Sequence, residues 1–298
     1  MNRYFDTHTH YNDPRFAGDL QEVLQGIRAV NVMGTSVIGY DLSSSIRGLQ
    51  LAEGSLPETR GGDLRGRPET QGGDLREQPR EEAYARCVAA VGVHPLHVPD
   101  ADEDDLLRLE ILAEDPKAAA IGEIGLDYAR KEGRPPADRD LQQYFFRKQI
   151  RIARRARLPV VIHSRDAAQD TAEILEQEKA AEVGGVIHCY SYSPEMAVRF
   201  LRLGFFLGIG GVVTYPGSKR LRETVRQVAL EHLVLETDAP YLPPDGHRGE
   251  RNDSRSLPLV AGEIARIKNI SVEEVCRKTW ENACKLYRIP EDHEGRRN

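Results

Sequence analysis

The sequence predicts an α/β protein with the (β/α)8 architecture of a TIM barrel, formed by residues 1–298 as a single domain. Eight short apolar, β-branched runs recur along the chain. Amphipathic helical patterns separate most of these runs, which is typical of a parallel sheet. Eight strands close such a barrel, and 298 residues fit it as one domain.

The strand candidates are rich in β-branched residues and lie between polar or glycine-containing segments. They span residues 3–8, 30–38, 87–93, 118–124, 158–163, 184–190, 205–210 and 232–237. Apolar residues at every third or fourth position predict helices at residues 43–53, 106–114, 141–156, 172–181, 195–203, 221–230 and 271–287. Asp166, Ser193 and Ser271 are the expected helix N-caps. An open doubly wound sheet is the alternative, but a glycine-rich phosphate loop would then be expected after the first strand.

Residues 54–80 interrupt this alternation with a repeat. PETRGGDLRGR is followed by PETQGGDLREQ, and prolines recur at positions 57, 68 and 79. The repeat has almost no apolar residues, so it cannot bury enough surface to offset its ordering entropy. Proline and a Gly-Gly pair in each unit exclude a long helix or coiled coil. We therefore expect a low-complexity, disordered surface insertion between the second and third strands, with a partner-binding tail as the alternative.

The composition restricts the class of protein. A formal net charge of −6 argues against a general polyanion binder, but not against an enzyme that holds one nucleic-acid end with a few arginines. No apolar run has the length of a membrane span, and Asp6, His8 and His10 interrupt the apolar core that a signal peptide needs. The four cysteines are widely spaced and predict thiols in a reducing compartment. We expect a cytoplasmic protein without a membrane partner.

The stretch YFDTHTHYND places two histidines two residues apart beside the first apolar run. In an extended strand, His8 and His10 would point to the same face and direct both rings to one point. Imidazole is a common metal ligand, although a polar N-terminal turn would also explain two histidines. Other strand ends carry further residues of this type: His94, Glu123, His163, His188 and Asp238. Because the carboxyl ends of barrel strands lie on one face, these residues are expected to converge there.

Four of these histidines and two carboxylates exceed what one tetrahedral ion needs, and they fit two divalent cations that share a bridging carboxylate. Glu123, on a strand roughly opposite the eighth, is the expected bridge. The expected ligands are His8, His10, Glu123 and Asp238 for one ion, and Glu123, His163 and His188 for the other. Asp238 could also act as general base towards the attacking water.

Eight motifs occur along the chain in a fixed order: FDTHTH, VGVHP, GEIGLDY, LPVVIHSRDA, VIHCYS, LETDAPYLPP, HRGERN and WENACKLY. In these motifs the chain resembles the TatD family of metal-dependent deoxyribonucleases, over nearly its whole length except residues 54–80. The resemblance implies a TIM barrel with two divalent cations (magnesium, manganese or zinc). It also implies a DNA hydrolase, often a 3′→5′ exonuclease with a role in DNA repair or turnover. The family's metal positions match His8, His10, Glu123, His163, His188 and Asp238.

Substrate contacts are expected on the loops around this face. Arginine can hold a phosphate bidentately, and the candidates are Arg165, Arg248 and Arg251, with Lys219 and Arg220 nearby. His94 is expected to contact the scissile phosphate, Tyr128 and Tyr241 to stack on bases, and Asp6 to be a partner of a ligand histidine. The segment HRGERNDSRS departs from the family pattern, in which proline soon follows the Arg-Asn pair.

Three functions are compatible with this sequence. The first is a DNA exonuclease or phosphodiesterase that acts on single strands or 3′ ends. The second is a binuclear amidohydrolase or lactonase-type hydrolase of a small molecule, many of whose members bridge the metals with a modified lysine where this chain has Glu123. The third is a non-catalytic nucleic-acid-binding barrel, against which the complete ligand set argues. The metal, the strandedness and the oligomeric state stay open.

Overall fold

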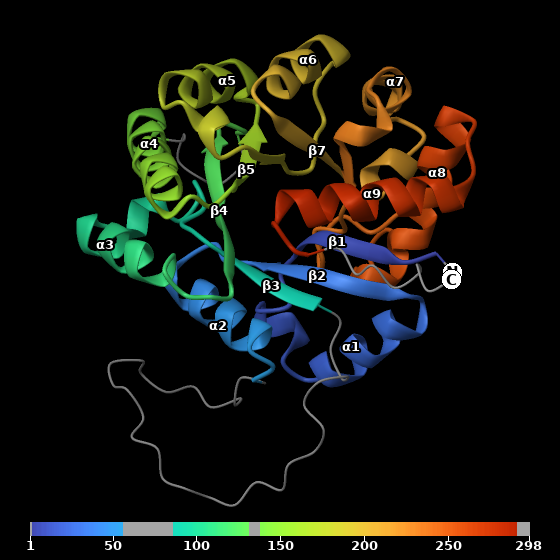
Figure 1. Ribbon diagram of the computed structural model, residues 1–298, viewed down its shortest axis with the longest axis horizontal. Helices are drawn as coiled ribbons and strands as arrows, with labels where there is room; N and C mark the ends of the chain where they lie inside the picture. Colours follow the sequence, from blue (N-terminus) through green and yellow to red (C-terminus); the bar gives the residue numbers. More distant parts are fainter. Residues whose placement is uncertain (1, 56–85, 131–137, 291–298) are drawn as a thin grey trace, which may run out of the picture.

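A computed structural model describes residues 2–55, 86–130 and 138–290 of the chain (Figure 1). Eight parallel strands follow one another around a single sheet in chain order. They are β1 (Tyr4–Thr9), β2 (Val32–Ile38), β3 (Arg86–Val91), β4 (Ala118–Asp127), β5 (Val160–Arg165), β6 (Gly185–Ile187), β7 (Phe205–Ile209) and β8 (Leu233–Leu235). The predicted (β/α)8 TIM barrel is therefore confirmed.

The helices surround the strands, as the apolar spacing of their sequences requires. They are α1 (Leu20–Ala29), α2 (Leu42–Ala52), α3 (Glu103–Leu112), α4 (Arg139–Ala156), α5 (Ala168–Gln177), α6 (Pro194–Arg202), α7 (Lys219–Gln227), α8 (Leu257–Lys268) and α9 (Val272–Leu286). Helices α1 and α8 lie outside the predicted helical segments, although Leu20, Val23 and Ile27 have the same apolar spacing and are buried.

The barrel closes between its first and last strands. The backbone N–H of Asp238 donates to the carbonyl of His8 at 3.0 Å, and the N–H of His10 donates to the carbonyl of Ala239 at 2.7 Å. Thr9 and Ala239 form a parallel bridge at the same level. Two segments that carry predicted ligands are thus joined directly, although they lie at opposite ends of the barrel sequence.

The amino-terminal part of the barrel interior is filled by apolar side chains. One buried cluster takes residues from different strands, including Phe5, Ala120 and Val234, and adds Trp280 and Tyr287 of the last helical segment. The Phe5 ring meets the Trp280 ring edge-on at 5.8 Å and stacks on the Tyr287 ring at 5.9 Å. Such packing fixes the strands at that end and leaves the carboxyl ends for polar side chains.

Local expectations were partly met. Ser193 and Ser271 cap α6 and α9, since each side chain accepts from the backbone N–H three residues on. The prediction that Asp166 caps a helix is wrong: α5 begins after Ala167, and Asp166 has a φ of 53°. That left-handed backbone does not have the extended conformation of an N-cap residue.

Parts of the domain prediction lie outside the described residues. Residues 56–80 of the expected insertion are among them, so the insertion and the single-domain extent of 1–298 stay predictions. Within the described ranges, none of the helices combines the length and the apolar character that crossing a membrane requires. The cytoplasmic location is a prediction that the fold does not test.

Candidate metal centre

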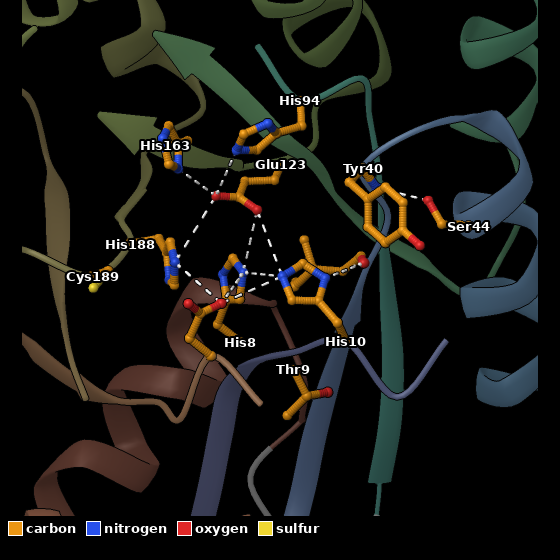
Figure 2. Close-up of polar contacts among 12 residues, drawn as sticks. His8, Thr9, His10, Tyr40, Ser44, His94, Glu123, His163, His188 and Cys189 are labelled. Carbon is orange, nitrogen blue, oxygen red and sulfur yellow. Dashed lines mark hydrogen bonds and ion pairs between the residues drawn. The ribbon is translucent and has the colours of Figure 1, made fainter. Parts of the chain in front are cut away.

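Six side chains from five different strands or their following loops meet at the carboxyl end of the barrel (Figure 2). Figure 2 shows the imidazole rings arranged around one central carboxylate, that of Glu123. The six residues are His8, His10, Glu123, His163, His188 and Asp238. The fold therefore brings together all the residues that the sequence predicted as ligands.

The first group consists of His8, His10, Asp238 and one oxygen of Glu123. The Nε2 atoms of His8 and His10 lie 3.2 Å apart, and each lies 3.5 or 3.8 Å from Glu123 Oε2. Asp238 Oδ1 is 3.7 Å from His8 Nε2 and 3.4 Å from His10 Nε2. Ligands at ~2.1 Å from a tetrahedral ion stand about 3.4 Å from each other. His8, His10 and Glu123 are therefore close enough to share a single divalent cation, and Asp238 lies beside the two histidines.

The other oxygen of Glu123 faces a second set of rings. Glu123 Oε1 lies 2.9 Å from His163 Nδ1, 3.8 Å from His94 Nε2 and 3.9 Å from His188 Nε2. The two oxygens of one carboxylate thus face two different groups of nitrogen atoms. This is the arrangement that a bridging ligand between two cations needs, and it supports the bridge predicted for Glu123.

Hydrogen bonds around the rings decide which nitrogen atoms are free. His10 Nδ1 lies 3.0 Å from the carbonyl oxygen of Ile38, which can only accept, so the ring proton is on Nδ1. The lone pair of Nε2 then points at Glu123 and Asp238. Asn12 supports the same carbonyl with its side-chain amide at 3.0 Å. His10 is therefore held in the tautomer that a metal ligand requires.

Two carboxylates that the sequence analysis did not single out lie behind the ligand rings. Glu236 Oε1 is 3.1 Å from His188 Nδ1, without the alignment of a hydrogen bond, and accepts from the backbone N–H of Cys189 at 2.6 Å. Asp127 Oδ2 lies 3.3 Å from His163 Nε2. Carboxylates in this position orient ligand imidazoles and raise their basicity.

Glu236 also lies near His8. Ligand-type atoms of Glu236, His8 and His188 lie within 4.8 Å of one another. His8 Nδ1, His188 Nδ1 and Glu236 Oε2 are buried and make no hydrogen bond. Buried polar atoms without partners are costly, so this group is consistent with a site completed by a bound cation that reorients the rings.

The electrostatics of the centre favour cations. Burial acts to lower the pKa of His188, but Glu236 and Asp238 outweigh it and raise that pKa to about 10. Burial acts to raise the pKa of Glu123, but His94, His8 and His163 hold it well below its usual range. The Glu123 carboxylate therefore stays ionised, and the His188 ring retains its proton. A divalent cation would replace that proton, so metal binding should release protons and weaken as the pH falls.

The position of Glu123 depends on an irregular stretch of β4. The pairing register of β4 with β5 shifts between Ile121 and Ile124, which places Glu123 in the unpaired part. Its backbone N–H donates instead to the carbonyl of Gly39 at 2.8 Å. This departure from regular pairing directs the Glu123 carboxylate to the centre of the ring of histidines.

Asp6 was expected to be a partner of a ligand histidine, and it contacts His8 through the backbone and not through the imidazole ring. Its carboxylate accepts from the backbone N–H groups of His8 and Thr237, at 3.2 and 3.0 Å. It also accepts from the hydroxyls of Thr237 and Ser254, at 2.7 and 2.6 Å. Asp6 therefore ties β1 to the segment after β8 and acts on the centre through the backbone.

The predicted phosphate-binding residues differ in their availability. Arg165 ends β5 and is exposed. The Arg248 guanidinium lies over the Tyr215 ring at 4.7 Å. Arg251 is already engaged, because it donates to the carboxylate of Asp19 and to the carbonyl of Arg15. Arg251 is therefore less available for a phosphate than the sequence indicated.

The aromatic candidates also differ. Tyr241 is exposed beside the centre, with its ring 6.0 Å from the His10 ring and the Arg15 guanidinium 4.2 Å above it. Tyr40, which the sequence analysis did not name, lies 5.7 Å from the His10 ring. The Tyr128 hydroxyl donates to Asp170 at 2.9 Å. Tyr241 and Tyr40 thus both lie next to the ligand His10.

Comparison with known proteins agrees with this geometry. A family model described as "TatD related DNase" matches residues 5–288. The chain belongs to the TatD family. It is 34% identical over 285 residues to the uncharacterized metal-dependent hydrolase YabD of Bacillus subtilis (strain 168), covering 96% of this chain and 99% of YabD.

Two further relatives extend the comparison. The chain is 40% identical over 203 residues to the uncharacterized metal-dependent hydrolase YcfH of Escherichia coli (strain K12), covering 68% of this chain and 74% of YcfH. The crystal structure of YJJV, a TatD homolog from Escherichia coli K12, superimposes with a TM-score of 0.82 at 28% identity and covers 97% and 99% of the two chains. This TatD-family chain is thus a member of a family of metal-dependent hydrolases.

Proposed function

We propose that this protein hydrolyses phosphodiester bonds of DNA, as a 3′→5′ exodeoxyribonuclease that uses two divalent cations. The observation that carries the proposal is the placement of the two Glu123 oxygens, one towards His8 and His10 and the other towards His163. The match to the TatD-related DNase family supports DNA as the substrate class. The cations would be magnesium, manganese or zinc, all of which such donor sets bind.

The roles proposed for Glu123 and Asp238 follow from the different exposure of their side chains. Divalent cations at such a site supply Lewis-acid polarisation of phosphate oxygens and a lower pKa of water. The Glu123 side chain is only 5% exposed and would hold the centre together, whereas the Asp238 side chain is 17% exposed. Burial acts to raise the pKa of Asp238, but His188, His10 and His8 lower it, so the carboxylate is ionised. Asp238 would therefore orient the attacking water and accept its proton.

Substrate positioning is assigned to the rim of the centre. Arg165, the last residue of β5, and Arg248, after β8, are exposed. They would hold phosphates on either side of the scissile bond. Arg251 would have to leave Asp19 to do the same. Tyr241 lies beside His10 and would stack on a terminal base.

The proposal is tested by hydrolysis of an end-labelled single-stranded DNA. We expect stepwise shortening from the 3′ end, loss of the reaction after metal removal with EDTA, and recovery when magnesium or manganese is added. An unlabelled RNA of the same sequence and a duplex with blunt ends serve as competitors that define the preferred substrate.

A metal-loaded protein that leaves both DNA and RNA intact would contradict the nuclease assignment. The metal centre would remain, and the substrate would then be sought among amides, lactones and small phosphodiesters. A protein that binds DNA without cleaving it under any metal would instead support a non-catalytic barrel.

A further inference from the structure

We propose that His94 is a catalytic hydrogen-bond donor to a non-bridging oxygen of the scissile phosphate and is not a metal ligand. This inference rests on the proposed phosphodiesterase function. Distance alone does not tell whether His94 is a metal ligand or a hydrogen-bond donor to the substrate. Ligand-type atoms of His94, Glu123 and His163 lie within 4.8 Å of one another and could be taken for a three-residue metal site.

The turn that follows β3 fixes the tautomer of His94. Pro95 has no N–H, so the next backbone donor belongs to Leu96, and this N–H donates to His94 Nδ1 at 3.0 Å. The turn is held on both sides, because the His94 N–H donates to the carbonyl of Tyr40 at 2.9 Å and the His97 N–H donates to the carbonyl of His94 at 2.8 Å. An Nδ1 atom that accepts a hydrogen bond carries no proton, so the proton of the neutral ring is on Nε2.

The N–H of Nε2 points into the centre. His94 Nε2 lies 3.8 Å from Glu123 Oε1, which is longer than a hydrogen bond, so the proton is not committed to that carboxylate. The His94 ring meets the His163 ring edge-on at 4.4 Å, and its side chain is 12% exposed (Figure 2).

His10 provides the contrast within the same centre. Its Nδ1 holds the proton against the Ile38 carbonyl and its Nε2 directs a lone pair inwards, whereas His94 directs an N–H inwards. A lone pair binds a cation, and an N–H binds an anion. The two histidines are thus distinguished by the backbone groups that contact their Nδ1 atoms.

The hydrogen bond would act without transfer of its proton. Negative charge on the non-bridging phosphate oxygens must be stabilised as the attacking oxygen forms its bond and the leaving oxygen departs. A fixed, buried donor stabilises that charge without reorganisation, and loss of one such donor lowers kcat by about 10²–10³-fold. The proton on Nε2 therefore stays on the ring throughout the reaction.

Two variants of His94 distinguish loss of the inward N–H donor from loss of the hydrogen bond that holds the turn. His94→Asn keeps an amide oxygen for the Leu96 N–H but removes the inward donor, whereas His94→Gln extends an amide N–H towards the position of Nε2. We expect His94→Asn to bind as much metal as the wild type and to lower kcat about 10²-fold, with a smaller loss for His94→Gln. A p-nitrophenyl phosphodiester of thymidine should slow by the same factor as DNA, because both have non-bridging oxygens.

Several outcomes would overturn the proposal. Reduced metal content in His94→Asn would make His94 a ligand, and a loss confined to DNA would place the donor on the leaving oxygen. A fall in kcat of less than about threefold in His94→Asn would show that His94 has no catalytic role, because the loss of one such donor costs far more.

A second measurement is independent of activity. Long-range ¹H–¹⁵N spectra of histidine-labelled protein report which ring nitrogen is protonated, with the His94→Asn variant identifying the signal. We expect a protonated Nε2 both without metal and with zinc added, whereas a zinc-dependent loss of that proton would contradict the proposal. If the wild-type protein leaves DNA intact, the proposed function fails, and these spectra still decide the role of His94.

Discussion

Replacing Glu123 by glutamine is expected to lower phosphodiester hydrolysis by at least about 10³-fold, since a lost bridging ligand removes several kcal/mol of transition-state stabilisation. The amide has the size of the carboxylate but not its charge. The Glu123 carboxylate lies within 4 Å of His8, His10, His94, His163 and His188. Because the substitution is isosteric, the barrel should keep its far-UV circular dichroism spectrum.

The measurement is steady-state hydrolysis of labelled DNA at saturating manganese. Glu114→Gln is the matched control, because Glu114 is exposed in the turn between α3 and the amino-terminal end of β4. This variant should retain wild-type activity. Activity of Glu123→Gln within tenfold of the wild type would contradict the bridging role.

Replacing Gly125 by alanine is expected to destabilise the protein by about 3–5 kcal/mol, the sum of a strained backbone and an overpacked contact. Gly125 has a φ of 142°, which only glycine adopts readily, and it pairs with His163 across β4 and β5. A Cβ atom here would lie 1.9 Å from the carbonyl oxygen of His163. The two strands would have to separate next to a ligand, so hydrolysis should fall as well.

Urea unfolding of the two proteins measures this effect through the shift of the midpoint. Gly262→Ala serves as the control, because Gly262 lies inside α8 with no atom within 4 Å of its Cβ position. The same substitution there should raise the free energy of unfolding by about 0.5–1 kcal/mol. A Gly125→Ala variant as stable as the wild type would show that β4 and β5 are less closely apposed than the structure indicates.

The sequence predicted the centre because its ligands are tied to the ends of strands. His163 lies within β5 and His188 directly after β6, and the carboxyl ends of all parallel barrel strands share one face. Their convergence therefore follows from topology and needs no knowledge of side-chain contacts. The short extents of β6 and β8 were not predicted. An error of a few residues at a strand end does not change the face of the barrel on which the ligand lies.

Contacts between distant segments were not predictable in the same way. Arg251 pairs with Asp19, which is 232 residues away, and nothing local marks that ion pair. The orienting role of Glu236 left a weak signal, since it precedes Asp238 by two residues in LETD and therefore lies near the same strand end. The correction for Asp6 has the same origin: its partners, Thr237 and Ser254, come from the other end of the chain.

The most direct test of the metal centre is a manganese titration of the wild type and Glu123→Gln by calorimetry, followed by electron paramagnetic resonance. We expect two ions per wild-type chain with an exchange-coupled signal, because one carboxylate would bridge them. We also expect proton release on binding, and loss of the coupled signal in Glu123→Gln. Manganese binding that is equal in the two proteins, or that shows only isolated ions, would contradict a centre organised around Glu123.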